Sequence, residues 1–178
     1  MRVKAVPGAF ATLRLSDALK TPHPPQQPED PHTMYKHILV PTDGSDISAK
    51  AVEAAVALAR LTGAGLHVLS VKEPFPYSAI SEMQPVPPQE FYDAQERIAR
   101  SRVEAAADVA ARAGGVQVDG ATVEALHPWE AILDHAKNKA CDLIVMASHG
   151  RRGLNALLLG SETQKVLTHS PLPVLVIK

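Results

Sequence analysis

Five short apolar runs alternate along this chain with longer segments that have helical periodicity. Alternation of strand and helix is typical of a parallel sheet with right-handed crossovers and with helices packed on both faces. The apolar runs are residues 38–40, 66–71, 116–125, 143–146 and 174–177. This order predicts an α/β fold, an open doubly wound parallel sheet of five strands with helices on both faces.

The segments between the runs carry ordinary helix signals. Residues 47–61 gather small and branched apolar side chains on one face, and Ser45 or Asp46 precedes them as a helix cap. Gly120 interrupts the third run and indicates a β-bulge. In the helix predicted over 91–114, the inward positions are Ile98, Val103, Ala106, Val109 and Ala110.

The first 33 residues differ from the rest of the chain. Repeated prolines between Thr21 and Pro31 prevent both helix continuation and pairing in a sheet. We therefore expect residues 1–33 to be a disordered extension and residues 34–178 to form one domain. Met34 stands directly before the first apolar run, which makes it an alternative start of the protein.

Composition excludes several classes of function. The formal net charge is −1 and no basic block occurs, which argues against nucleic acid as a partner. No apolar run is long enough to span a membrane. Cys141 is the single cysteine, so no internal disulfide forms and a reducing, cytoplasmic location is expected. We expect that thiol to be buried and inert.

Motifs for fast catalysis are absent from the sequence. It contains no P-loop, no G-x-G-x-x-G after the first strand and no G-x-S-x-G elbow. The histidines lack the helical spacing of a metal site, and one cysteine cannot build a thiolate zinc site. We therefore assign no catalytic residue and no protein-held metal, and we expect no fast turnover.

The segment from 142 to 168 combines a buried strand, a glycine-containing loop and a helix start. Ser161 and Gln164 have the spacing of a capping box, with Ser161 as the N-cap of a helix that carries Val166 and Leu167 inward. A helix N-terminus attracts anions, and glycine lets the backbone approach a phosphate closely. In open parallel sheets, ligands bind outside the carboxyl ends of the strands, where this loop falls.

The spacing of Ala147, Gly150, Gly160 and Ser161 resembles the G-x2-G-x9-G-[ST] signature of ATP-binding universal stress proteins. The resemblance extends from residue 35 to residue 178. It implies the strand order 3-2-1-4-5, which places the first and fourth strands side by side. Ala147 stands where the signature has its first glycine, and its methyl group reduces the room for a ribose or a phosphate.

The resemblance also implies a ligand and a set of binding residues. In ATP-binding members, the residues that match Thr42, Asp43 and Val71 surround adenine and ribose, and the glycine loop with Ser161 holds the phosphates. The implied ligand is ATP, with any Mg²⁺ carried by the phosphates. The candidate binding residues are Pro41, Thr42, Asp43, Val71, Met146, Ala147, His149, Gly150, Arg151, Gly153, Gly160, Ser161, Glu162 and Thr163.

Several of these residues have a second reading. Asp43 with Gly44 also makes a turn without any ligand, and His149 also serves as a hydrogen-bonding loop residue. Arg151 is either a solvated charge or a countercharge for phosphate. Glu162 suits the dipole of the helix start but repels a phosphate placed there.

Three functions are therefore weighed. The first is an ATP-binding regulator of the stress response, with at most very slow ATP hydrolysis. The second is an interaction module of the same fold, with its site blocked by Ala147 and Glu162. The third is an adenine-nucleotide hydrolase, whose S-G-G-x-D-S loop is absent after the first strand. By the resemblance, the final strand 174–177 lies at a sheet edge and joins two copies into a homodimer.

Overall fold

The computed structural model of the protein describes residues 34–75, 89–150 and 159–178. The chain divides into two compact units, 1–31 and 32–178. All described residues belong to the second unit. The predicted extension 1–33 lies outside the described residues, as do 76–88 and 151–158.

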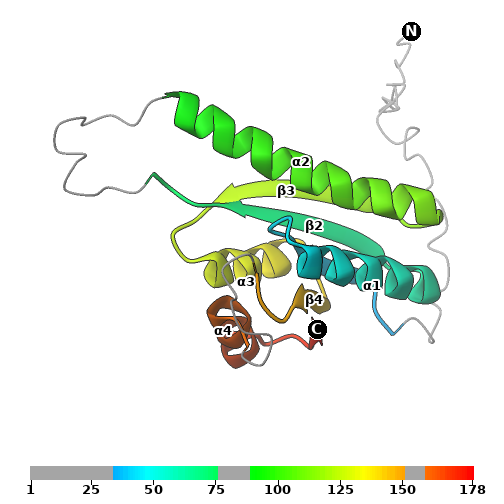
Figure 1. The fold of residues 1–178 in the computed structure, drawn as a ribbon. Helices are drawn as coiled ribbons and strands as arrows, with labels where there is room; N and C mark the ends of the chain where they lie inside the picture. The colour runs from blue at the N-terminus through cyan, green and yellow to red at the C-terminus, as the bar shows by residue number, and fades with distance from the viewer. Residues whose placement is uncertain (1–33, 76–88, 151–158) are drawn as a thin grey trace, which may run out of the picture. The chain divides into compact units, whose positions relative to one another are not determined.

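Strands and helices alternate throughout the second unit. The strands pair in parallel in the order β3-β2-β1-β4-β5, which confirms both the predicted fold class and the predicted strand order (Figure 1). The elements are β1 (His37–Pro41), α1 (Asp46–Thr62), β2 (Gly65–Lys72), α2 (Gln89–Ala113), β3 (Val118–Glu124), α3 (Pro128–Asn138), β4 (Leu143–Ala147), α4 (Ser161–His169) and β5 (Val174–Ile177).

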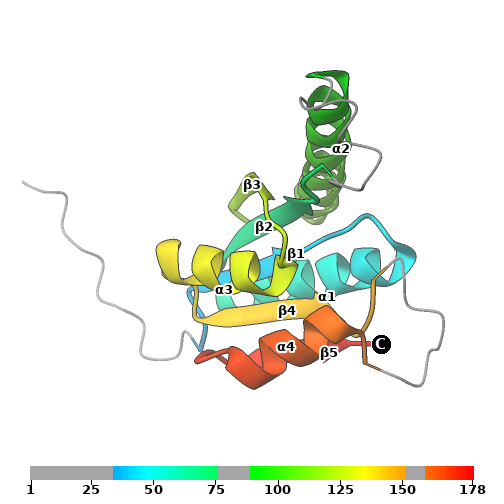
Figure 2. The same ribbon diagram turned by 90° about the vertical axis from the view of Figure 1, so that its left-hand side faces the viewer.

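Successive side chains of the central strands enter two different cores. Ile38 and Val40 of β1 pack with α1 and α2, whereas Leu39 packs with α3 and α4. This alternation is the two-residue period of a strand, and it requires helices on both faces of the sheet. Figure 2 views the same arrangement from the side of α3 and α4.

The ends of α1 follow their sequence signals. The Ser45 hydroxyl accepts a hydrogen bond from Ser48 N, so Ser45 is the N-cap. Gly63 ends the helix with a φ of 73°, the left-handed conformation that glycine adopts without strain. The small and branched apolar side chains predicted to share one face of 47–61 are buried: Ala51, Val52, Ala55, Val56 and Ala59.

Helix α2 sits on the sheet differently from its predicted orientation. Ile98 is 47% exposed, and Ala99 is buried in its place. The reason is close packing, because small alanines at this helix face let α2 approach β2 and β3. The predicted bulge at Gly120 is wrong, because β3 pairs with β2 without interruption. The glycine instead allows the close approach of α2. A methyl group on Gly120 would overlap Val103 of α2.

A partly exposed ion pair joins α2 to the carboxyl ends of β2 and β3. Glu96 accepts a hydrogen bond from Lys72 Nζ at 2.7 Å and another from Thr122 Oγ1 at 3.1 Å. The hydrogen bonds from Lys72 and Arg100 lower the pKa of Glu96 to about 2. Glu96 is therefore ionised at neutral pH and links α2 to both strands.

Candidate functional site

The turn after β1 is held by its own side chains. Asp43 Oδ1 accepts hydrogen bonds from Ser45 N at 3.1 Å and from Ser45 Oγ at 2.6 Å. The buried Thr42 contacts Ser48 Oγ at 3.2 Å and accepts a bond from Gly44 N. These contacts are those of an Asx turn, and they hold Asp43 Oδ1 against Ser45.

The segment after β4 is anchored to the neighbouring strand and to α4. Ser148 N donates to Ile177 O at 2.7 Å, and Ser148 O accepts from Gly160 N at 2.8 Å. The Ser148 hydroxyl also lies 3.0 Å from His149 Nδ1. His149 and Gly150 consequently emerge from the sheet at a fixed position.

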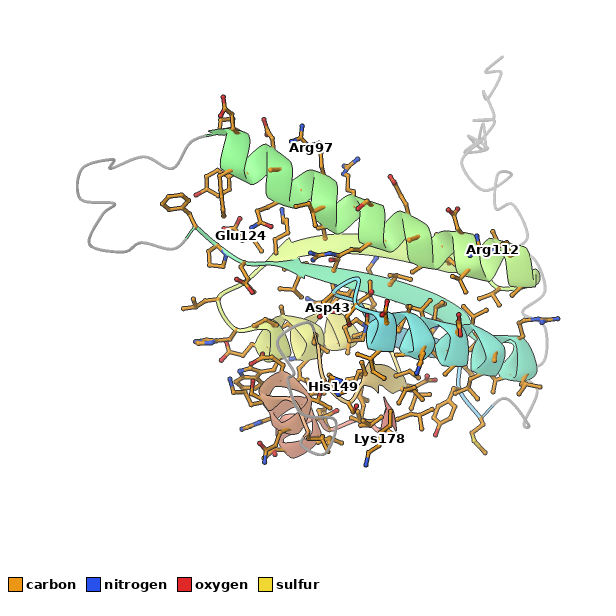
Figure 3. The ribbon with its side chains drawn as sticks, in the orientation of Figure 1. Asp43, Arg97, Arg112, Glu124, His149 and Lys178 are labelled. Atoms are coloured by element: carbon orange, nitrogen blue, oxygen red, sulfur yellow. The ribbon has the colours of Figure 1, made fainter. Side chains whose placement is uncertain are left out.

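The two turns meet at the carboxyl ends of β1 and β4. These strands are neighbours, with Ile38 opposite Leu143, and Figure 3 labels Asp43 and His149 on the segments that follow them. A methyl group on Gly150 would lie only 2.6 Å from Asp43 Oδ2. A side chain at 150 would therefore displace the Asp43 carboxylate from its present position.

Helix α4 begins beside the same segments. Its N-cap is Gly160, and Ser161 is its first helical residue, so the predicted capping box at Ser161 is wrong. Among the described residues no side chain caps this helix. A methyl group on Gly160 would lie 3.1 Å from the backbone of His149, a spacing that few side chains tolerate. The helix start consequently packs directly on the loop.

Two residues of the first turn of α4 have defined partners. Thr163 Oγ1 donates to Ala147 O at 2.9 Å and ties the helix to the end of β4. Glu162 turns away to the start of α3, where its Oε2 accepts from Trp129 N at 2.9 Å. Its Oε1 contacts Lys165 Nζ at 3.1 Å. Glu162 thus caps α3, and sequence reasoning gave no sign of this.

The remaining predicted residues occupy several positions around these turns. Met146 is buried in the core under α3 and α4, and half-buried Val71 packs at the edge of that core. Ala147 is buried at the end of β4, and Pro41 ends β1. Arg151 and Gly153 lie outside the described residues.

A residue that sequence reasoning missed reaches the β1 turn from α2. A methyl group on Gly44 would lie 3.1 Å from Arg102 Cγ and 3.3 Å from Arg102 Nε. Nothing near Arg102 in the sequence indicates this contact, because it depends on the rotation of α2 over the sheet.

The described residues also bear on metal binding, membrane insertion and thiol chemistry. Within it, no three His, Cys, Asp or Glu side chains are grouped so that they could hold a metal ion. None of the helices described here is long and apolar enough to cross a membrane. Cys141 is buried as predicted, and burial raises the pKa of its thiol to about 11, so the reactive thiolate is scarce at neutral pH.

Comparisons with known proteins agree on one family. A model of the universal stress protein family matches residues 34–178. Universal stress protein YxiE of Bacillus subtilis (strain 168) is 34% identical over 148 residues, which cover 82% of this chain and 100% of that protein.

Solved structures give the same result for the fold. The structure of protein MJ0577 of Methanocaldococcus jannaschii superposes with a TM-score of 0.68 and 30% identity, covering 82% of this chain and 96% of that one. A universal stress protein in complex with cAMP superposes with a TM-score of 0.62 and 25% identity, covering 81% and 97% of the two chains.

Proposed function

Because the chain belongs to the universal stress protein family, we propose that it is an ATP-binding regulator of the stress response. The nucleotide binds at the carboxyl ends of β1 and β4, beside the start of α4. The observation that carries this proposal is the close approach of Gly150 to Asp43, where a methyl group on residue 150 would lie 2.6 Å from Oδ2. The family relative solved with cAMP supports an adenine nucleotide as the ligand class.

Each part of the site has a chemical task in this proposal. Asp43 Oδ2 accepts hydrogen bonds from the ribose hydroxyls, with Pro41 and Thr42 shaping the turn, and Val71 gives the base an apolar wall. The first turn of α4, at Ser161 and Thr163, offers backbone N–H groups that have no partner within a helix. Phosphates meet these groups together with the segment that contains His149, Gly150, Arg151, Gly153 and Gly160.

The interaction module without nucleotide remains the alternative. It requires Ala147 and Glu162 to close the site. The contacts of Glu162 weaken this alternative, because its carboxylate is engaged by Trp129 N and Lys165 Nζ. Ala147 is its remaining support, since the methyl group stands where the family signature has glycine.

Calorimetry of ATP with Mg²⁺ tests the proposal, together with mass spectrometry of small molecules released from the purified protein. Gly150→Ala should weaken binding at least about tenfold, because its methyl group would meet the Asp43 carboxylate. Gly65→Ala is the matched control at the other end of the sheet, where the added methyl group meets its neighbours at 3.7 Å or more. Absence of heat from the unmodified protein, or equal heat from Gly150→Ala, would contradict the proposal.

We also propose a homodimer formed through β5. This strand is at the edge of the sheet, and its Leu175 is 41% exposed. An exposed apolar edge is available to pair with the same edge of a second copy. Sedimentation at micromolar concentration should give twice the monomer mass. The Leu175→Lys variant should sediment with the mass of a monomer.

A further inference from the structure

Arg102 links the middle of α2 to the turn that carries Asp43. Its side chain is half-buried, and three of its atoms lie within 3.4 Å of the place that a methyl group on Gly44 would take. Gly44 has a φ of 77°, so the turn needs glycine for its backbone and leaves its open side to the arginine. Glu96, on the same helix, holds α2 in position through Lys72 and Thr122.

The turn therefore has neighbours from two directions. On the α2 side, Arg102 covers Gly44. From β4, Gly150 faces Asp43 Oδ2. Within the turn, Ser45 holds Asp43 Oδ1 through its N–H and its hydroxyl. A displacement of the turn toward α2 would press the peptide at Gly44 against the arginine, and it would carry the Asp43 carboxylate with it.

We infer that Arg102 is a positioning residue for ribose recognition. Its side chain keeps the Gly44 turn in place, so that Asp43 presents Oδ2 to the ribose hydroxyls. The inference rests on the proposed function, because it concerns the same site. It adds a specificity role: Arg102 helps the protein to favour ligands that carry ribose hydroxyls. An arginine stem suits this role because it packs along backbone while its planar head makes directed contacts.

The test compares two ligands with one helix variant and its control. Arg102→Ala should bind ATP about tenfold more weakly, roughly the loss of one hydrogen bond to a charged group. It should bind 2′,3′-dideoxy-ATP as the unmodified protein does, because that ligand has no ribose hydroxyl for Asp43 to hold. Arg102→Lys, which keeps the stem, should recover part of the ATP affinity. Arg97→Ala is the control, since Arg97 is exposed on the outer side of the same helix (Figure 3).

Several results would overturn the inference. Equal losses for ATP and the dideoxy ligand would mean that Arg102 supports the fold only. A loss for ATP that disappears with adenosine would mean that Arg102 contacts the phosphates instead of acting through Asp43.

Amide hydrogen exchange separates this inference from the proposed function. Residues 42–46 should exchange faster in Arg102→Ala than in Arg97→Ala, whether or not nucleotide is present. Faster exchange without ATP binding by the unmodified protein would contradict the proposed function and the ribose role, while the contact with the turn would stand. Unchanged exchange would remove the contact itself.

Discussion

The turns after β1 and β4 and the amino end of the sheet are built in different ways. At the carboxyl end, the turns after β1 and β4 meet through backbone and glycine, with Gly150 against the Asp43 carboxylate. At the amino end, side chains fill the space. Asp119 Oδ2 lies 2.9 Å from Lys139 Nζ and 3.5 Å from His67 Nδ1, and the His37 and His67 rings are 5.7 Å apart. We call His37, His67, Asp119 and Lys139 the amino-end cluster.

This difference separates stability from binding. The side chains of the amino-end cluster contribute packing and ion pairs to stability, but they fill the space that a ligand would need. Glycines give up packing and keep the backbone accessible. We therefore expect substitutions in the amino half of the sheet to change the free energy of unfolding and to spare nucleotide affinity. Substitutions at the carboxyl-end turns should do the reverse.

The largest effect on stability is expected at Gly120, next to Asp119 of the amino-end cluster. In Gly120→Ala the new methyl group overlaps Val103, a stiff branched side chain on α2. Overpacking of this kind costs about 1–3 kcal/mol of unfolding free energy. Urea unfolding measures the loss, and ATP calorimetry should give an unchanged affinity.

The double variant Gly120→Ala with Val103→Ala sharpens this prediction. If the methyl groups compete for one space, the double variant should lose less stability than the sum of the two single variants. Additive losses would show that Gly120 is required for another reason. A fall in ATP affinity at equal folded fraction would break the contrast between the two ends.

Most of the fold follows from the sequence, because strand and helix periods persist over long segments. The prediction fails where a helix packs on the sheet more closely than its hydrophobic pattern indicates. Ile98 fits the helical period but is exposed, since Ala99 allows α2 to lie closer to the sheet. The predicted inward position of Leu167 is also wrong: it is 43% exposed, and the nine-residue α4 buries Thr163 and Val166 instead.

The site follows from the sequence only in part. The glycine spacing and the strand order place Gly150 beside Asp43, and the structure has that contact. The partners of Glu162 and Arg102 could not be predicted. Trp129 is 33 residues from Glu162, and Arg102 reaches Gly44 only through the rotation of a helix. Local sequence patterns do not predict such long-range contacts.

A smaller effect is expected from Glu162, which begins at the carboxyl end but acts on stability, because its side chain turns away to the start of α3. Glu162→Gln removes the negative charge at the start of α3, where the carboxylate accepts from Trp129 N. Loss of a charged cap costs about 1 kcal/mol of stability. ATP affinity should stay the same or rise slightly, because one negative charge has left the neighbourhood of the phosphates.

Glu162→Gln also tests whether this residue closes the site. If the unmodified protein shows no ATP binding and Glu162→Gln does, the interaction module becomes the better reading. Glu130→Gln is the matched control, being the exposed acid in the first turn of α3. It should change neither quantity by a comparable amount.

The smallest effect is expected from protonation of the amino-end cluster. The His67 side chain is only 15% exposed, and burial lowers its pKa below the ordinary value of 6.5, against the weaker attraction of Asp119. The pKa of His135 is lowered by burial in the same way. The unfolded chain therefore binds protons that the folded protein does not, and stability falls as pH drops below 6.5. It is fully present above that pH.

The midpoint of thermal unfolding should thus decline between pH 7 and pH 5, and His67→Gln should remove part of the decline. The exposed His127 provides the control, and His127→Gln should keep the decline in full. Asp119 does not interfere in this range, because Lys139 holds its pKa below 3.8. If His67→Gln declines as steeply as the unmodified protein, the cluster does not control acid stability. If His67→Gln also alters ATP affinity across this pH range, the two ends of the sheet are coupled and the contrast between them fails.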